Sequence, residues 1–148
     1  MRTIASGDSL SRSVGYGIKT VSTLLRGAME EALRPLELTV PQYACLELLG
    51  QRPGLSNAEL ARGAFVTRQS MNLVLRGPQA RGLVSRPATA NTGRARPSEL
   101  TADGEVMLAK AGLLIVDIEE RMLAGMPDAD RSVLLDALHT CSHNLGTD

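Results

Sequence analysis

The sequence is poor in aromatic residues and cysteines and has no long apolar run. Aromatic side chains make up 2% of the 148 residues, so the core must be built from aliphatic side chains, which suits packed helices. Cys45 and Cys141 form no CxxC pair, which excludes a disulfide framework and a zinc ribbon and favours small core residues. The longest apolar run, "AGLLIV", is far shorter than the roughly 18 residues that span a membrane. Because the N-terminus also lacks a signal-peptide core, we expect a cytoplasmic protein with no membrane partner.

The chain also lacks an arrangement of residues typical of catalysis. Both histidines fall in the last ten residues, and no nucleophile is paired with a base, so we expect no enzyme and no cofactor. Asp136, His139 and His143 share one helical face, a spacing that could begin a zinc site. A solvated polar face is the favoured interpretation, because no further ligand is apparent. "GYGIKT" at residues 15–20 lacks the preceding strand that a phosphate loop requires.

The net charge is zero, but the charges are unevenly distributed along the chain. Residues 52–96 contain eight arginines and one acid, Glu59, a net charge of +7, whereas the rest carries eight bases and fifteen acids, a net charge of −7. Such a field attracts a polyanion to one face, and guanidinium groups suit phosphates and guanine edges. The distribution favours a nucleic-acid partner. An arginine-rich solvated surface is the alternative.

Apolar residues at spacings of three and four predict a first helix over residues 9–33, with Ser9 as its N-cap. A stripe this long is not covered by so small a chain alone, which indicates a partner subunit. Thr39 with Gln42 forms a capping box that begins a second helix, ending near residue 51.

Two further helices have the layout of a helix-turn-helix. Ser56 caps a short helix with Glu59 reaching back, and this helix ends near Gly63. Thr67 caps the next helix, which begins at Arg68 and bears polar and basic groups in its first turns. Short strands at residues 83–87 and 94–100 flank a polar tip, as in a wing. Thr101 then caps a long helix ending near Gly125, and Pro127 starts the last helix.

Gly77-Pro78 interrupts the pattern of the second helix of this pair. Proline lacks the N–H that would donate to the carbonyl of Val74, at a cost of about 3 kcal/mol in a helix interior. We therefore predict that the helix kinks or ends there and that Gly82 closes it. Base contacts in a helix-turn-helix come from the first turns, here up to about Arg76, so the predicted break lies beyond them.

The ordered series "LT..Q", "GLS..ELA", "V(T/S)RQ", "GLV.R" and "LT..G" resembles the MarR family of winged-helix bacterial transcription regulators. The resemblance covers about residues 14–108. It implies a mainly α fold with a small β-wing, in which a winged helix-turn-helix is joined to N- and C-terminal dimerisation helices. The expected division of the single subunit, residues 1–148, is a DNA-binding lobe at 38–100 and a helical dimerisation region at 9–36 and 102–146.

Family membership implies a homodimer that binds pseudo-palindromic double-stranded DNA and that a small ligand or an oxidant often releases, and we expect this protein to be a repressor. By position, the resemblance assigns the major-groove contacts to Thr67, Arg68, Gln69, Ser70 and Asn72, with Arg76 at the end of that surface. Ser56 and Asn57 match the helix start that meets phosphate. Arg94 matches the wing arginine that enters the minor groove, and Arg96 would add attraction beside it.

This sequence departs from the family pattern in the wing. Thr92 stands where the family usually has an aspartate that orients the wing arginine, and Pro97 replaces a strand residue. The first helix contains no cysteine, which argues against peroxide sensing of the kind that some family members use.

The resemblance also implies an effector cleft between the dimer helices and the lobe. Tyr16, Gln42, Tyr43 and Arg86 are candidates to line it, with an anionic aromatic compound near Arg86. Ordinary core packing is the other interpretation of Tyr43. Two further function classes remain open from the sequence: a winged-helix module that binds protein with weakened or lost DNA binding, and a metal-responsive regulator.

Overall fold

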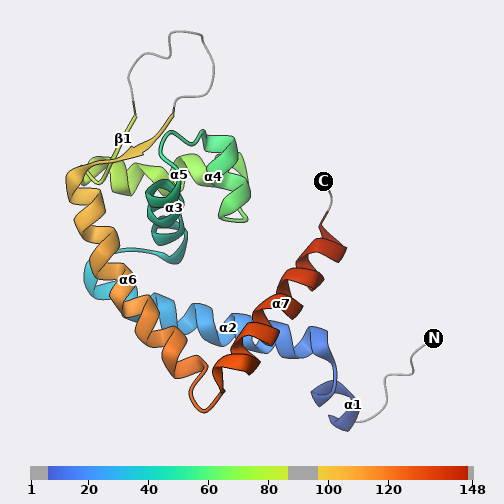
Figure 1. Cartoon of the computed structure of the whole chain (residues 1–148). Coiled ribbons are helices and arrows are strands. Elements are labelled where there is room, and N and C mark those ends of the chain that lie inside the picture. The colour runs from blue at the N-terminus through green and yellow to red at the C-terminus, as the bar shows by residue number, and fades with distance from the viewer. Residues whose placement is uncertain (1–6, 87–96, 147–148) are drawn as a thin grey trace.

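The computed structural model describes residues 7–86 and 97–146 of the chain. Helices dominate, and one small sheet completes the fold (Figure 1). In chain order the elements are α1 (Gly7–Ser11), α2 (Val14–Leu33), the 3₁₀ helix η1 (Arg34–Leu36), α3 (Val40–Gln51), α4 (Asn57–Gly63), α5 (Arg68–Ala80), β1 (Val84–Ser85), β2 (Glu99–Leu100), α6 (Ala102–Met122) and α7 (Asp128–Leu145). Within this part of the chain, no helix is both long and apolar enough to cross a membrane.

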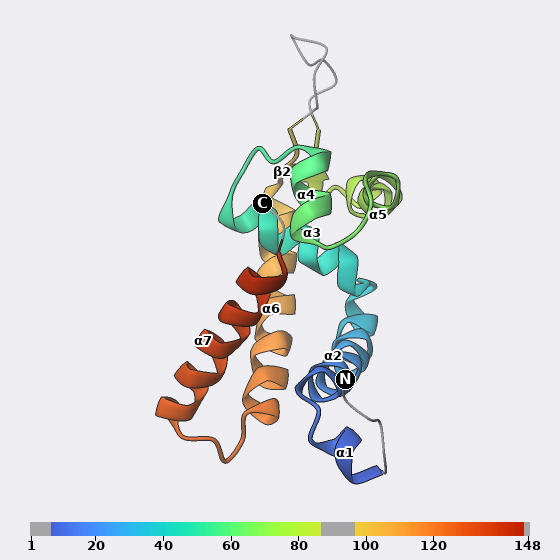
Figure 2. The ribbon, with the colours of Figure 1, turned by 90° about the vertical axis from the view of Figure 1, so that its right-hand side faces the viewer.

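The molecule consists of a lobe and a helical extension (Figures 1 and 2). The lobe contains α3, α4, α5 and the sheet, whereas α2, α6 and α7 extend away from it. The core lies mostly in the lobe and is almost entirely aliphatic, as the scarcity of aromatic residues predicts. Its buried members are Leu33, Leu38, Tyr43, Cys45, Leu46, Leu49, Leu55, Leu60, Ala61, Met71, Leu75, Leu83, Val84 and Ala111.

The predicted helix over residues 9–33 is two helices, so that prediction is wrong at its N-terminal end. The chain leaves the helical conformation at Ser13, whose φ and ψ of −79° and 121° are extended. Ser13 Oγ accepts a hydrogen bond from the Tyr16 N–H at 3.3 Å and so caps α2. Ser9 is not the N-cap, because it lies inside α1. The serine nearest the break satisfies a first-turn N–H that would otherwise lack a partner.

The other predicted caps are confirmed. Thr39 with Gln42 and Ser56 with Glu59 both form complete capping boxes. Hydrogen bonds from the Ser56 backbone and side chain lower the pKa of the Glu59 carboxyl. Because this pKa is lowered in the folded state, the stabilisation from Glu59 is present above its ordinary pKa and is lost as the pH falls through the lowered value.

Helix α5 continues through Gly77-Pro78 to Ala80, so the prediction that it ends at this point is wrong. Pro78 lies in the last turn, where it removes one hydrogen bond, and its ring is fully buried in the core. The helix ends as predicted at Gly82, whose φ is 71°. The Leu83 N–H donates to the Pro78 carbonyl at 2.8 Å and the Gly82 N–H donates to the Gln79 carbonyl at 3.0 Å, which is a Schellman motif. Burial of the ring and this motif together explain why the proline is tolerated.

The two cysteines differ in environment. Cys45 is buried, with Sγ 3.2 Å from Met71 Sδ, and burial raises the pKa of its thiol to about 12. It is the small core residue that the sequence predicts. Cys141 is only partly buried on α7, so its assignment to the core is wrong. The reason is that α7 buries no residue against its own chain.

Among the described residues, β1 and β2 are each two residues long, so the strands predicted at residues 83–87 and 94–100 are tested only in part. β1 and β2 pair antiparallel, with Val84 opposite Leu100 and Ser85 opposite Glu99. Leu55, which precedes α4, forms an isolated antiparallel bridge with Ser98. Pro97 precedes β2 and so removes no hydrogen bond from this ladder. The wing residues Thr92, Arg94 and Arg96 lie outside the described residues.

Candidate nucleic-acid interface

Helices α4 and α5 form the predicted helix-turn-helix. A short turn joins them, in which Phe65 has a φ of 58° and the Val66 N–H donates to the Ala61 carbonyl at 3.0 Å. Thr67 Oγ1 then accepts from the Ser70 N–H at 3.1 Å and caps α5. The two helices pack through buried side chains, Leu60 of α4 and Met71 and Leu75 of α5 among them. This packing fixes the direction in which the other face of α5 points.

That other face of α5 is exposed and polar. Met71, Leu75 and Pro78 face the core and Val74 packs partly against it, whereas the other side chains of the first two turns face solvent. A shallow surface hollow is lined by Thr67, Gln69, Ser70, Asn72, Leu73 and Arg76. Among the sequence candidates, Arg68, Gln69, Asn72 and Arg76 are therefore brought together on one accessible helix surface. Such a surface can present guanidinium and amide groups to base edges and phosphates.

Thr67 and Ser70 lie at the same helix start, but their hydroxyl groups are already engaged. Thr67 Oγ1 donates to Ser70 Oγ at 3.0 Å in addition to accepting from the Ser70 backbone. Ser56 Oγ likewise accepts from the Glu59 N–H at 3.2 Å. These hydroxyls chiefly terminate helices, and their exposed backbone N–H neighbours are the groups suited to phosphate.

Asn57, assigned by position to a phosphate contact, is held within the protein. It is half-buried at the start of α4, and its Nδ2 donates to Asn72 Oδ1 on α5. Its Oδ1 accepts from Nη2 of Arg86, which follows β1. Arg86 Nε donates in turn to the fully buried Ser98 Oγ at 3.3 Å. We call Asn72, Asn57, Arg86 and Ser98 the amide chain. It connects α5 to the base of the wing.

Sequence inspection missed the amide chain, although the motif "GLV.R" contains Arg86. Its members are 15, 29 and 12 residues apart along the sequence. The spacing of residues within one helix or strand cannot predict a contact between residues so far apart in the sequence.

The structure gives separate surroundings to the four residues predicted to line an effector cleft, Tyr16, Gln42, Tyr43 and Arg86, and the cleft itself stays a prediction. Tyr16 is exposed near the start of α2, at the end far from α3 (Figure 1). Gln42 Oε1 accepts from the Thr39 N–H at 3.0 Å. Tyr43 is buried, and burial together with Glu47 raises the pKa of its phenol to about 12. Arg86 is engaged in the amide chain, so the four side chains serve separate structural roles.

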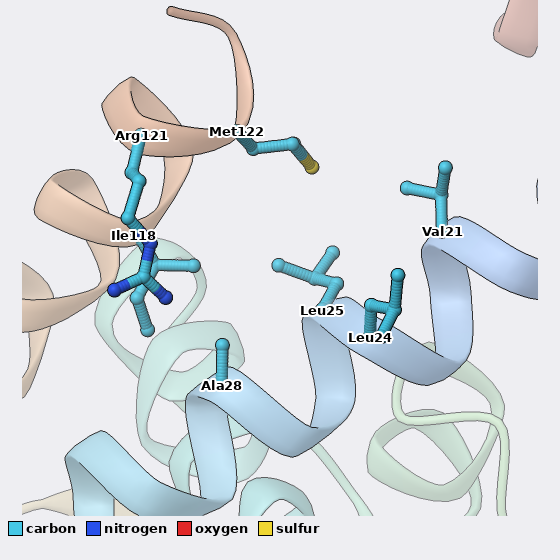
Figure 3. A pocket seen from close by; sticks show the side chains of 7 residues that line it. All are labelled: Val21, Leu24, Leu25, Ala28, Ile118, Arg121 and Met122. Atoms are coloured by element: carbon cyan, nitrogen blue, oxygen red, sulfur yellow. The ribbon is translucent and has the colours of Figure 1, made fainter.

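An apolar groove of about 250 Å³ lies instead between α2 and α6 (Figure 3). Its walls are aliphatic, and the guanidinium of Arg121 is its one charged group (Figure 3). The lining residues are Val21, Leu24, Leu25, Ala28, Ile118, Arg121 and Met122. A ligand with an apolar body and one negative charge would match this lining.

The three residues considered as zinc ligands lie on α7, and no further ligand is placed beside them in the described part of the chain. Asp136, His139 and His143 are all exposed. Across the described ranges, no group of three or more His, Cys, Asp or Glu side chains is arranged to hold a metal ion.

Comparison with known proteins identifies relatives of this chain. A sequence model of the MarR family matches residues 36–95. The HTH-type transcriptional repressor Rv2887 of Mycobacterium tuberculosis is 45% identical over 111 residues, which cover 75% of this chain and 80% of the relative.

Two crystal structures of the same relative resemble the fold closely. Rv2887 in complex with DNA is 37% identical and has a TM-score of 0.73, covering 87% of this chain and 97% of that one. Rv2887 in complex with salicylic acid is 40% identical and has a TM-score of 0.71, covering 87% and 96%. The ordered motifs, the lobe with its exposed α5 face and these similarities agree. The chain therefore belongs to the MarR family of winged-helix transcriptional regulators.

Proposed function

We propose that this protein is a dimeric, sequence-specific DNA-binding repressor that a small anionic aromatic compound releases from its operator. The observation that carries the proposal is α5, which continues through Gly77-Pro78 and presents Arg68, Gln69, Asn72 and Arg76 to solvent. The complex of Rv2887 with DNA supports it. Because the target is chromosomal DNA, the protein would act in the bacterial cytoplasm.

We assign DNA binding and dimerisation to different parts of the subunit according to which side chains are exposed. Residues 38–100 form the DNA-binding lobe, and residues 9–36 and 102–146 form the dimerisation region. Apolar side chains remain exposed on all three helices of that region, Val14, Ile18, Val21 and Leu24 on α2, Leu113 and Val116 on α6, and Leu134, Leu135 and Leu138 on α7. A second copy of the chain would cover them. Twofold symmetry would then place two α5 helices in successive major grooves, about 34 Å apart.

The contribution of α5 to phosphate binding predicts a change in salt dependence. Each phosphate contact contributes about 0.9 to the slope of log affinity against log salt. Arg76→Ala is expected to reduce the slope by about 2 in the dimer, because each protomer loses one contact. The measurement is a salt titration on duplexes selected from the source genome. Arg26→Ala is the control, since Arg26 pairs with Glu30 at 3.0 Å on α2, a helix of the proposed dimerisation region.

A protein-binding winged helix is the second candidate function, and two exposed apolar side chains on the lobe favour it. Phe65 is 93% exposed and Leu73 on α5 is 61% exposed. A flat salt profile for the wild-type protein on every duplex would support this candidate and would refute the repressor.

Repression would be relieved through the groove between α2 and α6. The complex of Rv2887 with salicylic acid supports an aromatic carboxylate as the effector. In this chain the ring would lie against Leu25 and Ile118, and the carboxylate would pair with Arg121. Because the groove borders the proposed dimer surface, a ligand there would alter the spacing of the two lobes, and DNA affinity would fall with it.

Salicylate is the probe for this site. Arg121→Ala is expected to weaken salicylate binding about tenfold in calorimetry, since a charge-assisted hydrogen bond contributes about 1.5 kcal/mol or more. Lys110→Ala removes a cation elsewhere on α6 and should bind salicylate as the wild type does. Equal affinities of Arg121→Ala and the wild type would place the effector at another site.

A further inference from the structure

The amide chain connects the base of the wing to α5. In each of its hydrogen bonds, the donor and the acceptor are determined by the chemistry of the side chains. Arg86 donates through Nη2 to Asn57 Oδ1 and through Nε to Ser98 Oγ. Asn57 Nδ2 donates to Asn72 Oδ1. Arg86 and Asn57 are half-buried, whereas Asn72 is exposed on the face of α5 that would meet DNA.

The chemistry of Arg86 determines which way each amide points. A guanidinium carries five N–H donors and no acceptor, so only the carboxamide oxygen of Asn57 can face it. The amino group of Asn57 must then face Asn72 and can only donate. Asn72 consequently turns its oxygen toward Asn57, and its amino group is left to face outward.

We propose that Asn72 contacts DNA through its amino group alone and thereby selects guanine, and that Arg86 imposes this choice through Asn57. The inference rests on the proposed DNA-binding function. A freely turning asparagine pairs with adenine by donating to N7 and accepting from N6. With its oxygen held by Asn57, Asn72 offers only donors, which match the adjacent N7 and O6 acceptors of guanine. Asn57 and Arg86 are positioning residues, and neither needs to touch the DNA.

The decisive variant is Asn57→Asp. A carboxylate only accepts, so it would accept from Arg86 and also from the amino group of Asn72, which would turn the Asn72 amide over. Asn72 would then present its oxygen to adenine N6 or cytosine N4. An acidic residue in the first turn of α4 is compatible with the helix dipole, so the variant should fold.

The experiment is selection of duplexes from a randomised pool by the wild type and by each variant. Asn57→Asp is expected to move the preference at one position in each half-site from guanine to adenine or cytosine, by about five- to tenfold. Asn57→Ala and Arg86→Ala should relax the preference there, because the amide can turn freely. Arg86→Lys keeps a donor toward Asn57 and should retain guanine. Ala58→Asp, which adds the same charge at the next residue, should lower affinity and also retain guanine.

The outcomes separate this inference from the proposed function. If Asn57→Asp selects the same sequences as the wild type, the amide chain does not control base choice and the inference is wrong. A wild-type protein that selects no duplex at all would refute DNA binding itself, and the inference would fall with it.

Discussion

Leu138→Glu is expected to convert the dimer into monomers and to lower operator affinity by at least about a hundredfold. None of the 18 residues of α7 is buried against its own chain, and Leu134, Leu135 and Leu138, which share one side of the helix, are 38%, 54% and 40% exposed. An isolated helix of this length is marginally stable in water, so the proposed second subunit is expected to cover its apolar side.

The size of the effect follows from symmetry. A carboxylate moved from water into an apolar contact costs several kcal/mol, and a twofold interface contains the substitution twice. Loss of the dimer separates the two lobes, so the second half-site no longer binds intramolecularly. Sedimentation equilibrium measures the first effect, and titration of a selected duplex measures the second.

Thr140→Glu is the matched control for this experiment. It adds the same charge to the same helix, at a position turned about 200° from Leu138. We expect it to remain dimeric and to bind the duplex. A Leu138→Glu protein that stays dimeric at micromolar concentration would show that α7 lies outside the interface.

Gly104→Ala is expected to destabilise the fold by about 3 kcal/mol, which corresponds to a fall in Tm of roughly 10 °C for a chain of this size. A Cβ at Gly104 would lie 2.0 Å from the Leu83 carbonyl oxygen and 3.0 Å from its carbon. Both are backbone atoms, so the clash is relieved only if α6 and β1 move apart.

Two hydrogen bonds hold these elements together at that point and would be strained by the movement. The Thr101 N–H donates to the Leu83 carbonyl at 3.0 Å, and Thr101 Oγ1 donates to the Gly82 carbonyl at 2.5 Å. The motif "LT..G" thus has a structural reason. Threonine caps α6 and binds the end of α5, and glycine permits the approach to the strand.

Gly112→Ala provides the comparison for thermal unfolding. A Cβ at Gly112 in the middle of α6 would meet no atom within 4 Å. Alanine is the better helix former, so this variant is expected to gain up to about 1 kcal/mol. If Gly104→Ala melts within a degree of the wild type, the close approach of α6 to β1 is not what stabilises this corner.

Most predictions that depended on neighbouring residues were accurate. The caps at Thr39, Ser56, Thr67 and Thr101 are confirmed, because each is a side chain bonded to a backbone N–H three residues away. The break at Ser13 was missed because Ser9 offers the same local chemistry. The effect of Pro78 was misjudged because the free energy by which a proline destabilises a helix depends on its distance from the helix end and on the packing around its ring.

The candidate DNA surface was predicted only in part. Arg68, Gln69 and Arg76 lie exposed on α5 as expected, although their contact with DNA stays a prediction. Asn57 was assigned to phosphate by position, yet its amide is bonded to Asn72 and Arg86. The effector cleft was placed around Tyr43 and Arg86, which the packed structure engages elsewhere.

The sequence by itself determined the family, the order of the helices, the positions of most caps and the gathering of arginines in the central third of the chain. These properties depend on contacts within one helical turn or on composition. They can therefore be predicted without knowing how the helices pack against one another. Only the tertiary structure decided that α5 continues through Pro78 and that α6 approaches β1 at Gly104. It also decided that the Asn72 side-chain oxygen faces Asn57 and not solvent. Each of these depends on atoms that are distant in sequence and meet only when the helices pack.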